Sequence, residues 1–176
     1  MSPLRLAPVV ALGLVLASCE SIQQLPTERL GSATLRFANG LPAGTAQLYG
    51  NGSEVSLSVA LAGFDPGTRG IHLHTTGKCD APGFTSAGGH LNPQGHQHGT
   101  ENPQGAHLGD LPNVTIGSSG GGTVSATLRS SRADALAALF DSDGTAIVVH
   151  AGPDDYRTDP SGNSGDRIAC GVFSRS

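Results

Sequence analysis

The segment from residue 70 to residue 80 has the sequence GIHLHTTGKCD. His72 and His74 are separated by one residue, so on a β-strand both side chains lie on the same face and can bind one ion together. A surface strand also carries such a pair by chance, so this segment alone leaves both alternatives open. The decision depends on which other donors the rest of the chain can bring to the same point.

The composition indicates one domain built from short strands and loops. The chain has 176 residues, of which 26 are glycine, with no tryptophan and only 4% aromatic residues. The core must therefore consist of Val, Leu, Ile and Ala, which is typical of short strands and not of a helical bundle. A domain of this length buries roughly two thirds of its unfolded surface, which is enough for an adequate core, so we expect one domain and no second full one. The formal net charge is −4 and no basic run exists, so we expect no nucleic-acid partner.

Alternating hydrophobic residues predict several half-buried antiparallel strands. The alternation covers residues 33–37, 55–61 and 123–128, and the segment AIVVH (146–150) is predicted to be a buried strand that ends in a histidine. Helical spacing occurs in SRADALAALF (131–140), where Ser131 and Asp134 resemble a capping box, so we expect one short helix there. Residues 75–110 and 151–166 lack such patterns and are expected to be long loops.

The first 19 residues resemble a bacterial lipoprotein signal. Arg5 precedes an apolar stretch at 7–17 that is too short to span a bilayer, and Leu-Ala-Ser-Cys at 16–19 resembles a lipobox. We therefore expect a signal peptide at 1–18, lipidation of Cys19, a tether at 19–30 and a domain at 31–176. This predicts a protein on the periplasmic side of a bacterial cell envelope, with its lipid in the outer or inner membrane; the absence of Asp at position 20 implies, by resemblance, the outer one. Ordinary cleavage with Cys19 left as a free thiol is the alternative.

The three cysteines fit an oxidising compartment only if one of them is used elsewhere. Lipidation of Cys19 would leave Cys79 and Cys170 to form one disulfide bond. A bridge that closes a loop of this length would stabilise the fold by about 4 to 5 kcal/mol. Two buried free thiols are the alternative.

All seven histidines lie between positions 72 and 150. A loop as polar as residues 75–110 is rarely ordered without an additional stabilising interaction, such as a bound ion, because its ordering costs conformational entropy. Glycine between the candidate donors would let the loop fold back on a cation. Beyond the HxH pair, these donors are His90, His98, His107 and Asp110.

Six motifs, in this order, resemble the copper/zinc superoxide dismutase family in its bacterial secreted form: GIHLHTTGKC, GGHLNP, the position of His98, HLGDLPNV, VVHAGPDD and GDRIACGV. The resemblance runs from about Gly31 to Phe173. It implies an all-β fold, a Greek-key antiparallel sandwich or barrel of about eight strands with long metal-binding loops. It also implies one copper and one zinc per chain, and superoxide anion as the substrate, converted to dioxygen and hydrogen peroxide.

The resemblance, carried over position by position, divides the donors between two metals. Imidazoles suit Cu(II) in a site with an open face, whereas three imidazoles and one carboxylate suit tetrahedral zinc. His90 would then bridge both metals. His96 falls outside the pattern as an exposed loop residue, with adventitious metal capture as the alternative. The copper ligands implied are His72, His74, His90 and His150. The zinc ligands implied are His90, His98, His107 and Asp110.

Two further residues match the family pattern. Asp154 resembles the carboxylate that accepts hydrogen bonds from one copper ligand and one zinc ligand and orients both. Arg167, three residues before Cys170, resembles the substrate-guiding arginine that would act in catalysis together with His90, because its guanidinium offers a small anion a donor fork and a local positive field. The alternatives are a solvated loop aspartate and a structural arginine.

The chain also departs from the family. The loop between His150 and Arg167 is shorter than in the animal cytosolic enzymes, and DDYRTDPSGN lacks their acidic and lysine cluster. Neither their steering charges nor their dimer surface can be transferred, which leaves the oligomeric state open, with a homodimer as one alternative. The main rival function is a non-catalytic envelope lipoprotein that binds or buffers copper with the same ligands. A further rival is a β-sandwich interaction module that binds no metal.

Overall fold

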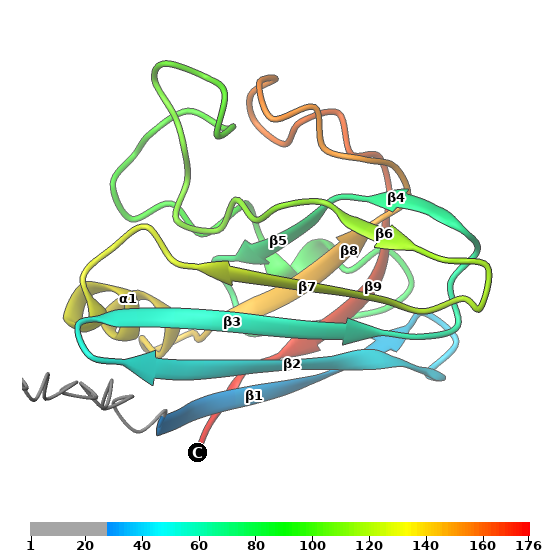
Figure 1. Cartoon of the computed structure of the whole chain (residues 1–176), viewed down its shortest axis with the longest axis horizontal. Helices are drawn as coiled ribbons and strands as arrows, with labels where there is room; N and C mark the ends of the chain where they lie inside the picture. The colour runs from blue at the N-terminus through cyan, green and yellow to red at the C-terminus, as the bar shows by residue number, and fades with distance from the viewer. Residues whose placement is uncertain (1–27) are drawn as a thin grey trace, which may run out of the picture.

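The alternating segments form strands of one curled antiparallel sheet (Figure 1). In the computed structural model, which describes residues 28–176, the strand order is β5-β8-β9-β1-β2-β3-β7, with β10 paired to β1. A separate pair consists of β4 and β6. The bounds are β1 Glu28–Phe37, β2 Pro42–Asn51, β3 Glu54–Leu61, β4 Gly67–Arg69, β5 Ile71–His74, β6 Val114–Ile116, β7 Gly122–Thr127, β8 Ala146–His150, β9 Arg167–Val172 and β10 Ser174–Arg175.

The connections between strands cross the sheet three times. After the β1-β2-β3 meander the chain passes through β4 to β5, at the opposite edge of the sheet. It then returns to β7 beside β3, and crosses again to β8 beside β5. This confirms the expected all-β, Greek-key class.

The core lies on the inner face of the sheet. On β3 the side chains of Val55, Leu57, Val59 and Leu61 are at most 4% exposed, and the residues between them are more exposed. They pack with Leu48 and other aliphatic residues in one large cluster. Each such buried side chain stabilises the fold by about 1.5 to 3 kcal/mol, so the alternation predicted from sequence is the alternation that builds the core.

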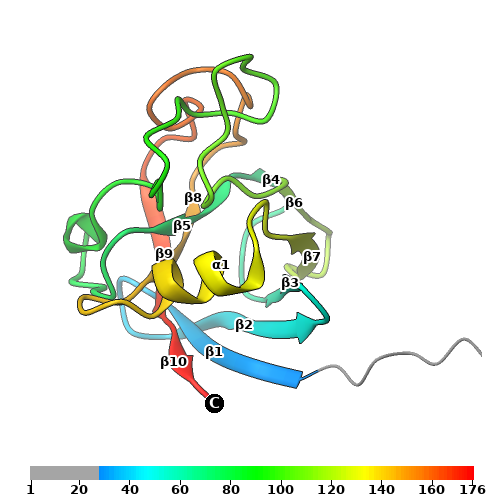
Figure 2. The same cartoon turned by 90° about the vertical axis from the view of Figure 1, so that its left-hand side faces the viewer.

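One short α-helix closes an end of the curled sheet (Figure 2). Helix α1 spans Arg132–Leu139, and the side chain of its N-cap Ser131 accepts a hydrogen bond from the Asp134 amide, as predicted. Ala135 and Leu139 are its buried residues. A 3-10 turn, η1, occupies Thr85–Ala87. No helix within residues 28–176 combines the length and the hydrophobicity that a membrane span requires.

The first strand begins earlier than the sequence pattern suggests. Glu28–Leu30 belong to β1, whereas we expected a tether up to residue 30. Leu30 and Ala33 are both buried although three positions apart, because the register with β2 shifts between Arg29 and Gly31 and interrupts the alternation. The expected signal peptide, Cys19 and the tether up to residue 27 lie outside the described residues.

The two long loops rise above the same side of the sheet, green and orange in Figure 1. The first loop returns along β5: the Leu73 amide donates to Gly109 O at 2.9 Å, and Leu73 O accepts from the Leu91 amide at 2.8 Å. A Cβ at position 109 would lie 2.4 Å from Leu73 O, so only glycine permits this approach. Bridges between His72 and Asp110 and between His74 and His90 result.

Candidate metal centre

Four buried histidines meet where β5, the end of β8 and the first loop converge. His72 and His74 lie on β5, His150 ends β8, and His90 lies in the loop. One donor atom of each lies within 4.8 Å of the corresponding atoms of the other three, and the rings are between 0% and 7% exposed. The structure therefore brings together the four residues that the resemblance assigns to copper.

Each of these rings has one nitrogen fixed by an oxygen acceptor. His74 Nδ1 donates to Gly88 O and His150 Nδ1 donates to Gly165 O, both at 3.0 Å. His72 Nε2 lies 2.7 Å from an oxygen of Asp154. His90 Nδ1 lies 3.0 Å from Asp110 Oδ1. The contacts of His72, His74 and His150 set the orientation of these rings and decide which nitrogen is left with a lone pair, whereas His90 Nδ1 faces the carboxylate of a second donor set.

The opposite nitrogens have no hydrogen-bond partner among the described residues. Buried polar atoms in proteins are nearly always paired, since leaving one unpaired costs free energy. Four such atoms in one place, all able to present a lone pair, fit a cation with imidazole ligands. The atoms are Nδ1 of His72 and Nε2 of His74, His90 and His150.

A second set of donors surrounds Oδ1 of Asp110. Nδ1 of His90, His98 and His107 lie 3.0, 2.9 and 3.3 Å from this oxygen, and the His90 and His107 Nδ1 atoms are 3.4 Å apart. A tetrahedral zinc with bonds of 2.0 to 2.1 Å separates its ligands by about 3.3 Å, so these spacings fit that ion. Asp110 Oδ2 accepts from the amides of Gly99 and His107, at 2.9 and 3.0 Å, which fixes the carboxylate.

One group of donor atoms that all lie within 4.8 Å of one another joins Asp110 with His72, His90 and His98, and leaves His107 out. We assign the fourth place to His107 because its Nδ1 is close to both Asp110 Oδ1 and His90 Nδ1. We do not assign His72 to this set, because its Nε2 is hydrogen-bonded to Asp154. His107 Nε2 donates to His96 O at 3.1 Å, which orients the ring.

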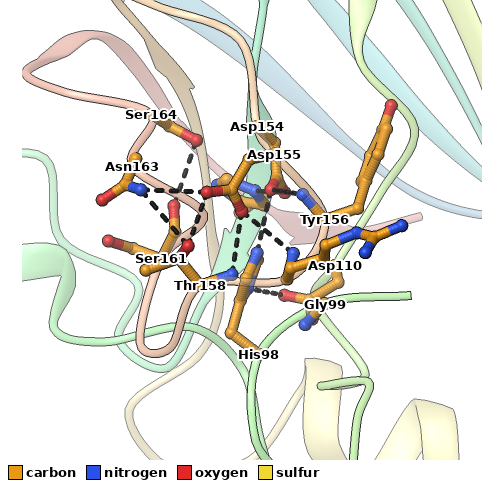
Figure 3. A network of polar contacts seen from close by, with 12 residues as sticks. His98, Gly99, Asp110, Asp154, Asp155, Tyr156, Thr158, Ser161, Asn163 and Ser164 are labelled. Atoms are coloured by element: carbon orange, nitrogen blue, oxygen red, sulfur yellow. Dashed lines mark hydrogen bonds and ion pairs between the residues drawn. The ribbon is translucent and has the colours of Figure 1, made fainter. Parts of the chain in front are cut away.

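Asp154 joins the two donor sets, and Figure 3 shows it beside His98 of the second set. Its Oδ2 accepts from His72 Nε2 and its Oδ1 accepts from His98 Nε2, at 2.7 and 3.0 Å, and Oδ1 also accepts from the Tyr156 amide at 2.7 Å. Asn113 holds the Asp154 backbone from the other side through two side-chain hydrogen bonds of 2.9 Å. Asn113 lies in the motif HLGDLPNV, but no role was predicted for it from the sequence.

Burial keeps the first set of imidazoles neutral. It lowers the pKa of His72 to about 3, of His74 to about 2 and of His150 to about 4, and it also lowers the pKa of His90. A neutral imidazole offers a lone pair, so these side chains are in the form that binds a metal.

The carboxylates respond in the opposite way. Burial raises the pKa of Asp110 and Asp154, but hydrogen bonds from their histidine partners outweigh it and lower both well below the usual range. Burial likewise lowers the pKa of His98, yet its bonds to the two carboxylates outweigh this and raise it to about 9. Both carboxylates are therefore charged at neutral pH, as a cation site requires.

Arg167 lies at the start of β9, on the wall of the same cleft. Its Nη1 donates to Phe84 O and its Nη2 to Gly88 O, at 2.9 and 2.7 Å. The cleft has a volume of about 420 Å³ and is also lined by His90, His150 and other polar residues. A fixed guanidinium thus stands beside the first donor set. Neither carbonyl could be identified from the sequence.

The disulfide ties this arrangement to the sheet. Cys79 and Cys170 are bonded, with Cα atoms 5.7 Å apart, which confirms the expected pair. The bridge fixes the loop that supplies the Phe84 and Gly88 carbonyls to the strand that carries Arg167. His96 is exposed and outside both donor sets, with Nδ1 donating to Ala106 O at 3.0 Å.

The sequence is similar to that of known proteins over nearly its whole length. The profile of the copper/zinc superoxide dismutase (SODC) family matches residues 42–173. The superoxide dismutase [Cu-Zn] 2 of Aquifex aeolicus is 39% identical over 175 residues, covering 96% of this chain and 98% of that protein. The superoxide dismutase [Cu-Zn] of Caulobacter vibrioides is 37% identical, covering 97% and 99%.

Solved structures share the fold. A SOD-like protein from Bacillus subtilis, at 35% identity, has a TM-score of 0.74 and covers 80% of this chain and 96% of that one. A Cu/Zn superoxide dismutase from Brucella abortus, at 23% identity, has a TM-score of 0.63 over 84% and 99%. The family is named for copper and zinc, and the two donor sets could hold these metals. On the family profile and the full-length relatives, the chain belongs to the copper/zinc superoxide dismutase family.

Proposed function

We propose that the protein is a superoxide dismutase that converts two superoxide anions and two protons into dioxygen and hydrogen peroxide. One observation carries the proposal: four buried ring nitrogens without hydrogen-bond partners among the described residues lie in one cluster, and two of their histidines, His90 and His150, line a cleft together with Arg167. Membership of the family and its named relatives support the same activity.

The donor chemistry assigns a metal to each set. Copper, when bound, supplies the one-electron redox chemistry, since zinc has no second accessible oxidation state. The unpartnered nitrogens of His72, His74, His90 and His150 would hold it. Nδ1 of His90, His98 and His107 with Asp110 Oδ1 would hold zinc, so His90 would belong to both sites.

Arg167 binds the substrate in this account. A guanidinium has about five N–H donors, and the carbonyls of Phe84 and Gly88 use two of them, so others stay available to an anion. Burial lowers the pKa of Arg167, yet a guanidinium stays protonated in proteins at neutral pH. The positive group counteracts the net negative charge of the whole chain at the point where superoxide binds.

His90 supplies a proton and Asp154 keeps its neighbours in place. In the first half of the cycle one superoxide would give its electron to the bound copper and leave as dioxygen, and His90 Nε2 would take up a proton. In the second half another superoxide would receive that same electron, together with the proton from His90 and one from water, and leave as hydrogen peroxide. Asp154 orients His72 and His98 throughout, since its two oxygens accept from their Nε2 atoms.

A copper-buffering protein would use the same histidines but would not need Arg167 in the cleft. The deciding experiment compares superoxide consumption by the metal-loaded protein and by Arg167→Ala. Loss of a charge-assisted hydrogen bond of about 1.5 to 3 kcal/mol should lower kcat/KM by roughly 10- to 100-fold with copper content unchanged. Full copper binding without turnover in the unaltered protein would favour buffering.

We also propose that the protein is a lipoprotein of a bacterial cell envelope, with lipid on Cys19. The sequence LASC at 16–19 supports this, and a disulfide is typical of compartments outside the cytosol. The intact-mass spectrum of the mature protein, compared with that of Cys19→Ala, checks it. A mature chain that retains an unmodified Cys19 thiol would contradict the proposal.

A further inference from the structure

The loop that follows Asp154 is closed by the carboxylate of Asp155. Asp155 Oδ1 accepts from the amides of Arg157 and Thr158 at 2.9 and 2.8 Å. Its Oδ2 accepts from the Thr158 hydroxyl at 2.6 Å and from Asn163 Nδ2 at 2.9 Å (Figure 3). These bonds, with that from the Thr158 hydroxyl first, lower the pKa of Asp155 to about 2, so the group is charged at neutral pH.

Backbone hydrogen bonds complete the closure. The Asp155 amide donates to Gly162 O at 2.9 Å, and the Gly162 amide donates to Thr158 O at 2.7 Å. We call residues 155–163 with these bonds the Asp155 clasp. The clasp reduces the number of conformations open to an otherwise irregular loop, so it lowers the entropy cost of placing Gly162.

Gly162 lies directly against the hydrogen bond between Asp154 and His98. A Cβ built at position 162 would be 1.8 Å from Asp154 Oδ1 and 2.7 Å from His98 Nε2, whereas real Cβ atoms come no closer than 3.0 Å to other heavy atoms. The φ angle of Gly162 is +64°, which also favours glycine. Gly162 is buried, as is Asp154, so its backbone covers the carboxylate on this side.

We propose that Gly162 and the Asp155 clasp are the positioning element that holds the Asp154 carboxylate in line with both His72 and His98. The inference rests on the proposed metal centre, because the value of this alignment is that it orients a ligand of each metal. If Asp154 Oδ1 is displaced, it loses the bonds from His98 Nε2 and from the Tyr156 amide. Partners of metal-bound histidines typically contribute 10- to 100-fold to metal affinity.

The variant Gly162→Ala tests the contact, with Gly40→Ala as its matched control. Both glycines have positive φ angles, +64° and +83°, so both substitutions strain the backbone. A Cβ at Gly40 meets nothing within 4 Å, whereas one at Gly162 forces Asp154 Oδ1 to move by more than about 1 Å. Both variants are made in the full-length chain and matched to the unaltered protein by circular dichroism.

Two measurements separate positioning from general destabilisation. Zinc affinity, by competition with a chromophoric chelator and Zn(II), should fall by about 10- to 100-fold in Gly162→Ala and by less than about twofold in Gly40→Ala. The Nε2 proton of His98, followed by ¹H–¹⁵N NMR in metal-free and zinc-loaded protein, should be lost or shifted in Gly162→Ala alone. Equal zinc affinity and an unchanged His98 signal in the two variants would overturn the inference.

A gentler change tests the clasp itself. Asp155→Asn places a donor opposite the Asn163 donor, so zinc affinity should fall by several-fold. The double variant Asp155→Asn, Asn163→Asp exchanges acceptor and donor and should restore it. Failure of this rescue, with both proteins folded, would contradict a positioning role for the clasp. None of these measurements uses turnover. A protein that binds both metals but is inactive would therefore contradict the proposed dismutase activity and leave this inference intact.

Discussion

Nδ1 of His90 lies 3.0 Å from Oδ1 of Asp110, while Nε2 on the other side of the same ring has no hydrogen-bond partner among residues 28–176. The ring therefore stands between two donor sets, one centred on Asp110 and one formed with His72, His74 and His150. Because each set has members that the other lacks, the two metals should respond separately to substitutions.

The first prediction concerns this separation. His107→Ala removes a donor of the Asp110 set and leaves the other set untouched, so zinc retention should fall at least about tenfold while copper binding persists. Metal content after dialysis, measured by elemental analysis, checks it. His96→Ala is the control, since that exposed imidazole belongs to neither set. Normal zinc retention in His107→Ala would show that the zinc assignment is wrong.

The second prediction concerns the stability of the metal-free protein against pH. The folded-state pKa values of His72, His74 and His150 lie at about 3, 2 and 4, below the ordinary value of 6.5. Between about pH 6.5 and pH 4 the unfolded chain binds more protons, so stability falls as pH falls through this window. For each of these histidines, the free energy of unfolding should be about 2 kcal/mol lower at pH 5 than at pH 7.

The contribution of His98 to stability changes with pH in the opposite direction. Its folded-state pKa is raised to about 9, so its contribution is present below 6.5 and is lost as pH rises towards 9. Urea unfolding of chelator-treated protein at several pH values measures the balance. His74→Gln should reduce the loss between pH 7 and pH 5 by about 2 kcal/mol. A free energy of unfolding that stays level over this range would contradict the buried, neutral state of these rings.

The third prediction concerns the disulfide. Cys79 and Cys170 are 91 positions apart, and a loop of that size corresponds to about 4 to 5 kcal/mol in the chain-entropy account. The double variant with alanine at both positions should lose about that much free energy of unfolding. It should also lower kcat/KM, because the Phe84 and Gly88 carbonyls would no longer be tied to the strand of Arg167. A loss below about 1 kcal/mol would show that the bridge contributes little to the fold.

The fourth prediction concerns charge in the cleft. Asp159 lines the same cleft as Arg167, and its Oδ1 accepts from the His98 amide at 2.6 Å. Asp159→Asn keeps an acceptor but removes a negative charge near the path of an anion. In the proposed reaction, kcat/KM at low ionic strength should rise about two- to threefold, and the gain should vanish at high salt.

Asp65→Asn serves as the control for net charge, because Asp65 is exposed and does not line the cleft. It removes the same charge from the protein and should leave kcat/KM nearly unchanged. Equal rate increases in the two variants would mean that the effect of Asp159 comes from total charge and not from its place.

Regular alternation made much of the fold predictable. Strand β3 was predicted from the alternating hydrophobic residues Val55, Leu57, Val59 and Leu61. The start of helix α1 was predicted to within one residue from its N-cap, Ser131. Strand β2 was not anticipated, because its inward positions include Ala43 and Ala46, small residues that carry little hydrophobic signal. The start of β1 was missed because a bulge changes the phase of its pattern.

The metal centre was predictable as a set of residue types but not as a geometry. The HxH pair follows from strand periodicity. By contrast, His90 and Asp110 come close to this pair only because the loop pairs with β5 through the hydrogen bond between the Leu73 amide and Gly109 O. The carbonyls that orient His74 and His150 carry no sequence signature, since every residue has one. The contact of Gly162 with Asp154 depends on a loop conformation that local patterns do not encode.

The most direct test is a crystal structure of the protein loaded with copper and zinc, with each metal located by anomalous scattering at its own absorption edge. The account predicts two ions that share the imidazole of His90, one on Nε2 with His72, His74 and His150, and one on Nδ1 with Asp110. Two ions without a common ligand, or a single ion within both donor sets, would contradict it.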